Sequence, residues 1–514
     1  LPNETVTWRW SISPRMTGQQ RISIFLLLHW QPDSAGDGQV KESVIFDRNL
    51  EIKVISFMGL RKSEAMTLGF SGLMLSGVLG IWAASGRQKP RRKRMAVLQA
   101  SEKITIESAS GIELEPNEKR LFQALFRKYD RLILKNEFLS GYSGARSFLA
   151  HPVYADGQTD AETIIKIGPC QDIENEYNHY ESYVKDRLPP VTARIQSSPV
   201  AIAGFNKAAL QYTCISEPGK SPSSLRQALL SNPDPAYIQR LFDTFGPNWW
   251  MQRKPHTFCL AEEYDRLLPP HYVLEPVSGT AKITLDKDSK PDQLSLLMGD
   301  MVTVSSFEQR ELRRDGKSMT LFGIQKPGMP AARFRWLCPS PPKNTTARVV
   351  ATRNDLLLQL TDGFNLAGLS NPLFKIDDWL HETINGTRSI IHGDLNLENV
   401  LIGPGNLVWL IDFAQTREGH PLYDFSHLAC ECIAHVLGPR NLDARQFISL
   451  LEKGDDPLLE RIERIASSCL FNPSYEREYR LALILSSLGG LKYQNLTGQA
   501  RQLLFLAAAY YGQE

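Results

Sequence analysis

The sequence predicts an α+β protein with two lobes and a small inserted β-domain, preceded by one transmembrane helix and an N-terminal all-β, sandwich-like segment. Two observations carry most of this prediction. One uncharged run is long enough to cross a bilayer, and the residues after 116 mix strand-like alternation with helical spacing of apolar residues. The length of 514 residues allows two to four domains. The net charge of +2 gives no general reason to expect a nucleic acid as a partner.

Residues 1–60 are predicted to form an extracytoplasmic β-sandwich-like segment. Val6, Trp8 and Trp10 alternate with polar residues, and a second alternation runs from Leu50 to Val54. Sixty residues are few for a complete sandwich, and the chain begins with Leu1. We therefore expect this segment to be truncated and the chain to be part of a longer precursor.

Residues 65–86, AMTLGFSGLMLSGVLGIWAASG, are predicted to form a transmembrane helix, because these 22 residues carry no charge. Arginine and lysine dominate the start of the following linker, residues 87–115, which places that side in the cytoplasm and the N-terminus outside. The basic linker is also expected to contact the lipid bilayer. Small residues four apart predict a homodimer face: Gly72, Ser76, Gly80 and Ala84.

The cysteines support the same topology. All seven follow residue 169, and their spacing fits neither a zinc site nor a disulfide framework. We expect reduced thiols and a single-pass membrane protein whose lobes are cytoplasmic.

Residues 116–273 are predicted to form the N-lobe and the start of the C-lobe. A strand, a glycine turn and a second strand are followed by a strand that carries Lys166 and a helix that carries Glu176. Glycines let backbone amides close over phosphates, and a lysine held by a helix carboxylate reaches the α- and β-phosphates of a nucleotide. Glu174 is the alternative partner of Lys166. The predicted nucleotide-binding residues are Gly141, Ser143, Gly144, Lys166 and Glu176.

Residues 346–514 are predicted to form the C-lobe and to carry the catalytic loop. His392-x-Asp394-x4-Asn399 follows one apolar run, and Asp412 follows the next. This spacing is that of a loop whose carboxylate orients an attacking hydroxyl and accepts its proton, with an amide and a second carboxylate that hold Mg²⁺. We therefore predict Asp394 as the catalytic base, Asn399 and Asp412 as metal ligands, and ATP and Mg²⁺ as cofactors.

The segments "IIHGDLNLENVLI" and "LIDFAQTREGHPLYDFSHLA" resemble the aminoglycoside phosphotransferase and choline-kinase-like branch of the protein-kinase-like fold. The similarity extends over about residues 116–514, apart from the insertion, and the bacterial ternary-complex-associated kinase-like domain is a possible sub-branch. It implies a bilobal kinase-like domain, with His392 and Asp424 as structural residues of the motif. Gly419, Pro421 and Phe425 match the end of the family pattern.

Three departures from the pattern bear on turnover and substrate. Asn396 replaces the lysine or histidine of related loops, Asp412 lacks the third glycine of the protein-kinase motif, and the glycine turn is short. The interval between Asp412 and Asp424 leaves little room for a phosphorylatable segment or a peptide platform. A small-molecule acceptor is therefore expected.

Residues 274–345 are predicted to form a small inserted β-domain, with a five-stranded barrel of the oligonucleotide-binding type as the candidate architecture. Arg310, Arg313, Arg314 and Lys317 cluster there, with Phe334 and Trp336 nearby. A solvated charged face is the favoured interpretation, and binding of nucleotide or nucleic acid is the alternative.

Two functions compete at this level. The first is a membrane-anchored, ATP-dependent phosphotransferase. The second is a kinase-like module that binds nucleotide or a partner and signals without turnover. The intact set of Asp394, Asn399 and Asp412 favours the first.

Overall fold

The computed structural model divides the chain into two compact units, Leu1–Arg92 and Lys93–Glu514. It describes residues 18–30, 41–54, 56–57, 60–61, 96–97, 104–109, 111–138, 145–188, 193–214, 223–276, 300–304, 307–315, 318–325, 332–337, 347–493 and 495–513. The predicted transmembrane helix and its small-residue face lie outside these ranges. In the part that is described, no helix has both the length and the apolar character needed to span a bilayer.

The described residues of the first unit form strands. A long antiparallel pair joins β1 (Gly18–Trp30) to β2 (Lys41–Val54), with an irregularity at Leu26/Leu27. Two short strands follow, β3 (Ser56–Phe57) and β4 (Leu60–Arg61). The alternation that begins at Leu50 lies in β2, whereas the Trp8 pattern lies outside the described residues.

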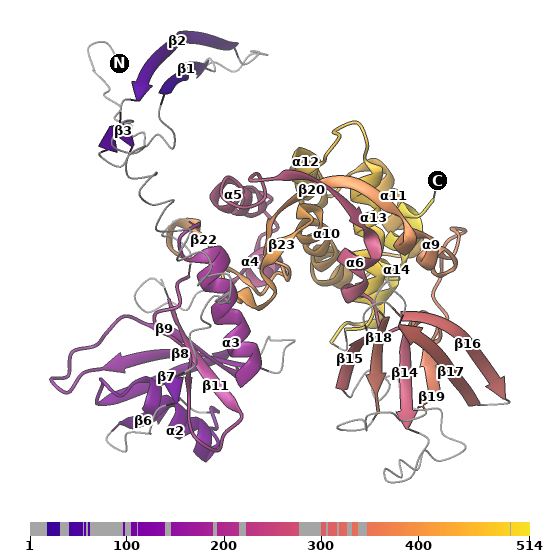
Figure 1. The fold of residues 1–514 in the computed structure, drawn as a ribbon, viewed down its shortest axis with the longest axis horizontal. Coiled ribbons are helices and arrows are strands. Elements are labelled where there is room, and N and C mark those ends of the chain that lie inside the picture. Colours follow the sequence, from indigo (N-terminus) through magenta and orange to yellow (C-terminus); the bar gives the residue numbers. More distant parts are fainter. Residues whose placement is uncertain are drawn as a thin grey trace, which may run out of the picture. The chain divides into compact units, whose positions relative to one another are not determined.

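The N-lobe is built on one seven-stranded sheet with the order β5-β10-β11-β9-β8-β7-β6. Figure 1 labels β6, β7, β8, β9 and β11 of this sheet. Its strands are β5 (Ala96–Val97), β6 (Thr105–Ser108), β7 (Arg131–Phe138), β8 (Arg146–Val153), β9 (Thr163–Pro169), β10 (Val200–Ala201) and β11 (Lys207–Thr213). Its helices are α2 (Pro116–Leu125), α3 (Cys170–His179) and the π-helical turn η1 (Tyr180–Val184). Thr105–Ser108 were expected in the linker. They instead form an edge strand that pairs in parallel with β7.

The alternation of side chains along β9 decides which residues face each helix. Ile165 and Ile167 pack in the core under α2, whereas Ile164 packs with Ile173 of α3 in the larger core. Because side chains alternate across a strand, Lys166 lies on the α3 side of the sheet. The sequence pattern of this strand therefore directs the lysine toward the helix that carries Glu176.

A buried carboxylate fixes α2 against the sheet. Glu118 is fully buried and bonds the backbone N–H of Glu115, which caps the first turn of the helix. Arg146 Nη1 lies 2.5 Å from Glu118 Oε2, and Lys207 Nζ lies 3.2 Å from Glu118 Oε1. Two cations thus compensate the buried charge and join α2 to β8 and β11.

The inserted domain is a six-stranded sheet with the order β15-β18-β14-β19-β17-β16. Its strands are β14 (Tyr272–Pro276), β15 (Asp300–Val304), β16 (Phe307–Asp315), β17 (Ser318–Gln325), β18 (Ala332–Trp336) and β19 (Ala347–Thr352). The sheet begins before residue 274 and ends after residue 345, and it has six strands where five were expected.

Chain connectivity shows that this sheet curls. A flat sheet of six strands is about 24 Å across. The strands at the two ends of the order, β15 and β16, are separated along the chain by residues 305–306 alone, a span of at most about 11 Å from Val304 to Phe307. The sheet must therefore bend toward itself at this connection, as a barrel does. Arg310, Arg313 and Arg314 lie on β16, and their side chains are outside the described structure, as is Lys317.

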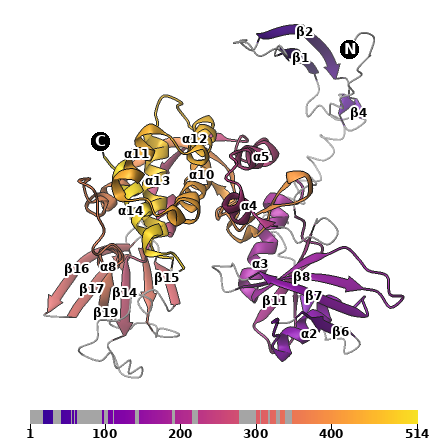
Figure 2. The same ribbon diagram turned by 180° about the vertical axis from the view of Figure 1, so that it is seen from behind.

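The C-lobe is mostly helical (Figure 2). It also carries two small three-stranded sheets, with the orders β12-β21-β22 and β13-β20-β23. Its strands are β12 (Ser223–Ser224), β13 (Lys254–Cys259), β20 (Thr383–Ile391), β21 (Val400–Ile402), β22 (Val408–Leu410) and β23 (Arg417–Gly419). Its α-helices are α4 (Leu225–Ser231), α5 (Ala236–Phe245), α6 (Leu260–Tyr264), α8 (Arg353–Leu360), α9 (Ile376–His381), α10 (Pro421–Cys432), α11 (Ala444–Lys453), α12 (Pro457–Cys469), α13 (Arg477–Gly490) and α14 (Gly498–Tyr511). Shorter turns are η2 (Asp265–Leu267), η3 (Pro372–Lys375), η4 (Pro404–Asn406), η5 (Phe413–Gln415), η6 (Ile433–Leu437) and η7 (Gly438–Arg440).

Helix α10 is the central element of this lobe. All of its residues are buried, including the polar side chains of Asp424, Ser426, His427 and Glu431. A helix that is buried all round belongs in the core of a large domain.

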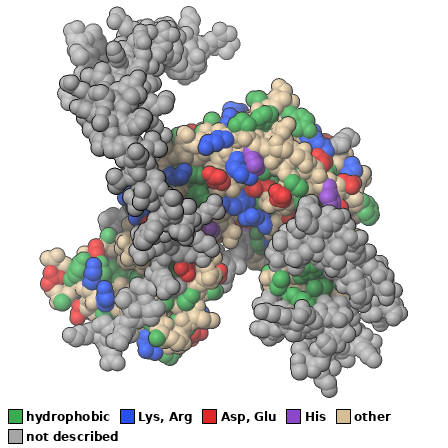
Figure 3. Space-filling model, viewed as in Figure 1, with side chains coloured by type: hydrophobic (Ala, Val, Ile, Leu, Met, Phe, Trp, Pro, Cys, Tyr) green, Lys and Arg blue, Asp and Glu red, His purple; other side chains and the backbone are tan. Residues whose placement is uncertain are grey.

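On the face shown in Figure 3, charged side chains of both signs are interspersed over the described surface. The six cysteines among the described residues form no disulfide with one another.

Candidate active site

Two neighbouring strand pairs bring Asp394 and Asp412 together. Strand β20 ends at Ile391, and the loop from His392 to Asn399 follows it directly. The β21–β22 hairpin then returns the chain, and the Ile411 amide donates to the Asn399 carbonyl at 3.0 Å. Asp412 follows Asn399 by 13 positions and Asp394 by 18 positions. The hairpin nevertheless holds all three residues on one edge of the C-lobe.

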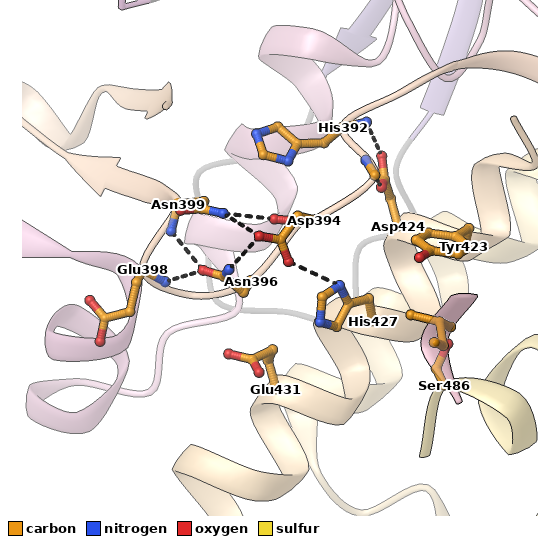
Figure 4. A network of polar contacts seen from close by, with 12 residues as sticks. His392, Asp394, Asn396, Glu398, Asn399, Tyr423, Asp424, His427, Glu431 and Ser486 are labelled. Atoms are coloured by element: carbon orange, nitrogen blue, oxygen red, sulfur yellow. Dashed lines mark hydrogen bonds and ion pairs between the residues drawn. The ribbon is translucent and has the colours of Figure 1, made fainter. Parts of the chain in front are cut away.

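The carboxylate of Asp394 is held by two asparagines of its own loop (Figure 4). Asn396 Nδ2 donates to Asp394 Oδ2 at 3.3 Å, and Asn399 Nδ2 donates to the same oxygen at 3.2 Å. Asn396 Oδ1 in turn accepts from the backbone amides of Glu398 and Asn399 at 3.0 and 2.9 Å. Asn396, which departs from the family pattern, therefore shapes the loop and orients the carboxylate.

Asp424 of helix α10 fixes the start of this loop by accepting hydrogen bonds from two of its backbone amides. Its Oδ2 accepts from the amide of His392 at 2.7 Å and its Oδ1 from the amide of Gly393 at 2.8 Å. Trp250 Nε1 also donates to Oδ2 at 2.8 Å. Burial raises the pKa of Asp424, and the three donated hydrogen bonds and the neighbouring His392 oppose that rise. Asp424 thus holds the backbone at the start of the loop that carries Asp394.

Gly393 is required by the backbone at this position. Its φ of +79° is left-handed, and a Cβ placed there would lie 2.2 Å from the carbonyl oxygen of Gln415. Only glycine satisfies both conditions. The neighbouring His392 is fully buried, and its Nε2 lies 3.0 Å from the Ile411 carbonyl, which ties the loop to the strand end before Asp412.

Lys166, Glu176 and Asp412 form one ion-paired group between the lobes. Lys166 Nζ lies 2.9 Å from Glu176 Oε2 and 2.7 Å from Asp412 Oδ2. Burial alone would lower the pKa of Lys166, but the two carboxylates raise it above the ordinary value. Lys166 likewise lowers the pKa of Asp412 against the effect of burial. The ammonium and the Asp412 carboxylate are therefore both ionised at neutral pH.

The partner of Lys166 is Glu176 and not Glu174. Glu176 is buried, and its second oxygen accepts a hydrogen bond from the hydroxyl of Tyr212 on β11. Burial raises the pKa of Glu176, and the charge of Lys166 opposes that rise. Residue 174 faces outward on the same helix and is partly exposed.

Asn399 and Asp412 suit a hard divalent cation. Because Asn399 donates through Nδ2 to the Asp394 carboxylate and its carbonyl, the amide is oriented with Oδ1 as an available acceptor. The side chain of Asp412 is 22% exposed. Mg²⁺ is commonly held by one or two protein ligands together with phosphate oxygens. Among the described residues, no cluster of three or more His, Cys, Asp or Glu is arranged to hold a metal unaided.

The structure brings together Lys166, Glu176, His392, Asp394, Asn399, Asp412 and Asp424, as the hydrogen bonds and ion pairs above show. Gly141, Ser143 and Gly144 lie outside the described residues, so their role in nucleotide binding stays a prediction. Sequence reasoning missed three side chains: Tyr212, Trp250 and His427. His427 Nδ1 lies 3.9 Å from Asp394 Oδ1 (Figure 4). The available signal was its position one helical turn after Asp424.

The segment that follows Asp412 is tied into the C-lobe. Strand β23 pairs with the end of β20, from Ser389↔Gly419 to Ile391↔Arg417. Arg417 Nη2 lies 2.7 Å from Glu263 Oε1, and its guanidinium lies over the Tyr423 ring at 4.8 Å. A Cβ at Gly419 would lie 2.1 Å from Arg417 Nη1, so this motif glycine makes room for the ion pair.

Comparisons with known proteins assign the chain to a family. A model of the family described as ternary complex associated domain 9 matches residues 133–453. No curated protein matches the chain. The match to the family model covers more than half of the chain and includes Lys166, Asp394 and Asp412.

Several solved structures are similar at low identity. A thermostable mutant of aminoglycoside phosphotransferase APH(4)-Ia in ternary complex with ADP and hygromycin B is 12% identical, with a TM-score of 0.30 over 71% of this chain and 89% of that chain. An amicoumacin kinase in complex with AMP-PNP, Ca²⁺ and Ami is 13% identical, with a TM-score of 0.33 over 68% and 78%. A Plasmodium vivax ethanolamine kinase is 11% identical, with a TM-score of 0.31 over 77% and 90%.

Proposed function

The chain belongs to the ternary complex associated domain 9 family, and we propose that it is an ATP-dependent phosphotransferase that acts on a hydroxyl group of a small molecule. One observation carries the proposal. Lys166 of the N-lobe forms an ion pair with Glu176, and its Nζ lies 2.7 Å from Asp412 Oδ2 of the C-lobe. The loop that holds Asp394 and Asn399 lies beside this group. A cation for phosphates, ligands for a metal and a positioned carboxylate are the parts that phosphoryl transfer needs.

Asp394 has the position and exposure of a base. Its Oδ2 is occupied by two amide donors, and its side chain is 33% exposed, so an acceptor hydroxyl can reach it. The acceptor oxygen forms a bond to the γ-phosphorus while the bond from that phosphorus to the β,γ-bridging oxygen breaks. The hydroxyl proton passes to Asp394, and ADP leaves with the bonding electron pair.

Asn399 and Asp412 are the residues that would hold Mg²⁺, and when bound the ion neutralises negative charge on the triphosphate. Lys166 supplies positive charge for the α- and β-phosphates, and Glu176 and Tyr212 keep its ammonium in place. Gly141, Ser143 and Gly144 complete the proposed nucleotide site.

The acceptor is proposed to be small because the segment between Asp412 and Asp424 is short and held in place. Strand β23 is paired to β20, and Arg417 is anchored by Glu263. A peptide substrate needs an open platform at this point, and the pairing leaves none in these residues.

The test is ADP formation by the full chain with a panel of hydroxyl acceptors. Asp394→Asn should reduce turnover by about 10²–10⁴-fold and leave ATP affinity near that of the wild type, because Asp394 acts on the acceptor. Lys166→Ala should weaken both ATP affinity and turnover. Glu398→Gln is the matched control, since this carboxylate of the same loop points to Arg226 at 3.5 Å.

The competing function is a kinase-like binding module without turnover. ATP binding by the wild type with no transfer to any acceptor, together with normal signalling by Asp394→Asn in cells, would contradict the enzyme and support that module.

We also propose that the protein crosses the membrane once through residues 65–86, with the N-terminus outside and the lobes in the cytoplasm. The uncharged run and the basic linker after it support this topology. An impermeant thiol reagent should label Ser43→Cys and not Ser101→Cys in intact cells. Labelling of Ser101→Cys alone, or equal protection of the two sites, would contradict the topology. Lipid contact by the linker and pairing through Gly72 and Gly80 stay predictions.

A further inference from the structure

Three residues of α10, about one helical turn apart, face the loop that carries Asp394. Asp424 holds the backbone at the start of the loop, and Glu431 Oε2 accepts from the amide of Leu397 at 3.5 Å. His427 lies between these two residues on the same face of the helix, beside the carboxylate of Asp394 (Figure 4). Helix α10 is buried all round, so it holds His427 at a fixed place behind Asp394.

The two oxygens of the Asp394 carboxylate have different surroundings. Oδ2 accepts from the side-chain amides of Asn396 and Asn399 at 3.3 and 3.2 Å, and these two donors use both of its lone pairs. Within the described part of the chain, no hydrogen bond reaches Oδ1, which lies 3.9 Å from His427 Nδ1. A proton that Asp394 takes from an acceptor hydroxyl therefore binds to Oδ1, the oxygen that faces the imidazole.

His427 has an unused polar atom at this contact. The residue is 6% exposed, and its Nδ1 is buried and forms no hydrogen bond within the described residues. A buried polar atom without a partner reduces stability, and a catalytic role is one reason why such an atom persists in a native protein. Burial lowers the pKa of His427, and the charge of Asp394 opposes that change, so the ring is neutral at pH 7. A neutral ring with its lone pair at Nδ1 can accept a proton.

We propose, on the basis of the phosphotransferase function above, that His427 is a second proton acceptor that acts through Asp394. In the first step the O–H bond of the acceptor breaks, its proton binds to Asp394 Oδ1, and the oxygen bonds to the γ-phosphorus. In the second step the bond from Oδ1 to this proton breaks and a bond from the proton to His427 Nδ1 forms. Asp394 is then a carboxylate again, and it stabilises the imidazolium beside it.

The second transfer is chemically favourable. Imidazole is a stronger base than a carboxylate, with an ordinary pKa of about 6.5 against about 3.9. A hydrogen bond between these atoms needs Oδ1 and Nδ1 to approach by about 1 Å. The Asp394 side chain can make this movement, because it is 33% exposed and lies on a loop. After the products leave, the imidazolium returns its proton to water through the same carboxylate, which restores both groups.

The first experiment tests the pair without turnover. The C2 hydrogen of a histidine ring exchanges with deuterium at a rate that depends on ring protonation, and mass spectrometry measures this rate for each histidine of the full chain. The pKa of His427, obtained from its exchange profile against pH, should be lower in Asp394→Asn than in the wild type, because the carboxylate that stabilises the imidazolium is gone. Glu398→Gln, in the same loop, should leave that profile unchanged, and His381, exposed at the end of α9, is the internal control.

The other groups near His427 are the same in the wild type and in Asp394→Asn, so a shift reports Asp394. They are Asp424, His392, Lys492, Glu431, Cys430 and Tyr493. Equal exchange profiles of His427 in the two proteins would overturn the pair.

The second experiment tests the relay by the pH profile of turnover. His427→Asn cannot take a proton, so kcat should fall by about 10²-fold, the lower end of what a proton acceptor contributes, while KM for ATP and for the acceptor stays near the wild-type value. In the wild type, kcat should fall as pH drops through the pKa of His427, because an imidazolium cannot accept a proton, and His427→Asn should lack this dependence. His435→Asn is the matched control, since it replaces a buried histidine that lies beside Glu431 at 3.7 Å.

The outcomes separate the relay from the enzyme. Wild-type kcat in His427→Asn, or a lower kcat with the same pH dependence as the wild type, would overturn the relay and leave the phosphotransferase in place. Absence of transfer by the wild type to any acceptor would contradict the proposed enzyme, and the relay with it. If His427→Asn does not fold, the exchange profile of His427 in Asp394→Asn decides whether the two groups are linked, because that substitution changes only a partly exposed side chain.

Discussion

The ammonium of Lys166 lies 2.7 Å from the carboxylate of Asp412, although the two residues come from different lobes. Lys166 is carried by β9 of the N-lobe sheet, and Asp412 follows β22 of the C-lobe. Asp412 also adopts a left-handed backbone with φ of +63° at the turn into η5. The two charges that the proposed mechanism assigns to ATP and its metal are thus paired with each other, and a nucleotide would bind by exchanging this pair for its own charges.

Glu176→Gln should weaken the use of ATP. The buried carboxylate is the second partner of Lys166, at 2.9 Å, and glutamine keeps the shape but not the charge. A hydrogen bond to a charged group is worth about 1.5–3 kcal/mol, so kcat/KM for ATP should fall by about 10- to 100-fold. Glu174→Gln, two residues earlier on the same helix, should behave as the wild type. Equal effects of the two substitutions would show that the helix is disturbed and that the ion pair is not the cause.

Asp412→Asn should remove the dependence of nucleotide binding on Mg²⁺. The substitution removes a negative charge that faces both Lys166 and the proposed metal position. Calorimetric titration with ATP, with and without Mg²⁺, should show a large gain from the metal for the wild type and little gain for the variant. Asp362→Asn on an exposed loop is the control. If the variant keeps the full metal-dependent gain, Asp412 is not a ligand.

The loop from His392 to Asn399 was predictable because its residues are close together in the sequence. His392, Asp394 and Asn399 are close in sequence, so their spacing alone places them on one turn after a strand. Lys166 and Glu176 were predictable from chain order, since a strand residue and a residue near the start of the next helix must be near each other. The choice between Glu174 and Glu176 depended on which side of α3 faces the sheet.

Contacts between distant segments were not predictable in the same way. The bond from Trp250 to Asp424 and the sharing of Asp265 by Arg333 and Arg353 join elements far apart in the chain. Such contacts are set by how helices and the inserted sheet pack, and no local pattern encodes that packing. The sixth strand of the insertion was missed for a related reason, because β14 and β19 are short strands that border helical segments.

Gly393→Ala should destabilise the protein and displace the loop that carries Asp394. The residue has φ of +79°, and the new Cβ would lie 2.2 Å from the Gln415 carbonyl oxygen. A strained left-handed residue costs about 1–3 kcal/mol before any clash is counted. Gly405→Ala is a matched control, because Gly405 has φ of +65° in an exposed turn and its Cβ would meet nothing within 4 Å. The difference between the two unfolding free energies, measured in denaturant, reports the clash alone. Equal losses would mean that the loop moves freely away from Gln415.

Glu431→Gln should change how stability depends on pH. Burial, with Asp394 next, raises the pKa of Glu431 from 4.5 to about 8 in the folded protein. Between these values the folded state holds a proton that the unfolded state has released, so the wild type loses stability as pH rises, by at most about 1.4 kcal/mol per pH unit from this group. Glutamine cannot ionise, so the variant should lose less stability from pH 5 to pH 8 and should be the more stable protein at pH 8.

The measurement is the unfolding free energy in denaturant at several pH values. The buried Trp249 and Trp250 provide the fluorescence signal. Titrating groups distant from Glu431 contribute equally to both proteins, so the difference between the two curves reports Glu431 together with its neighbours Asp394 and His435. Glu452→Gln, an exposed glutamate of α11, should follow the wild-type curve. Parallel curves for Glu431→Gln and the wild type would mean that Glu431 is ionised in the folded protein.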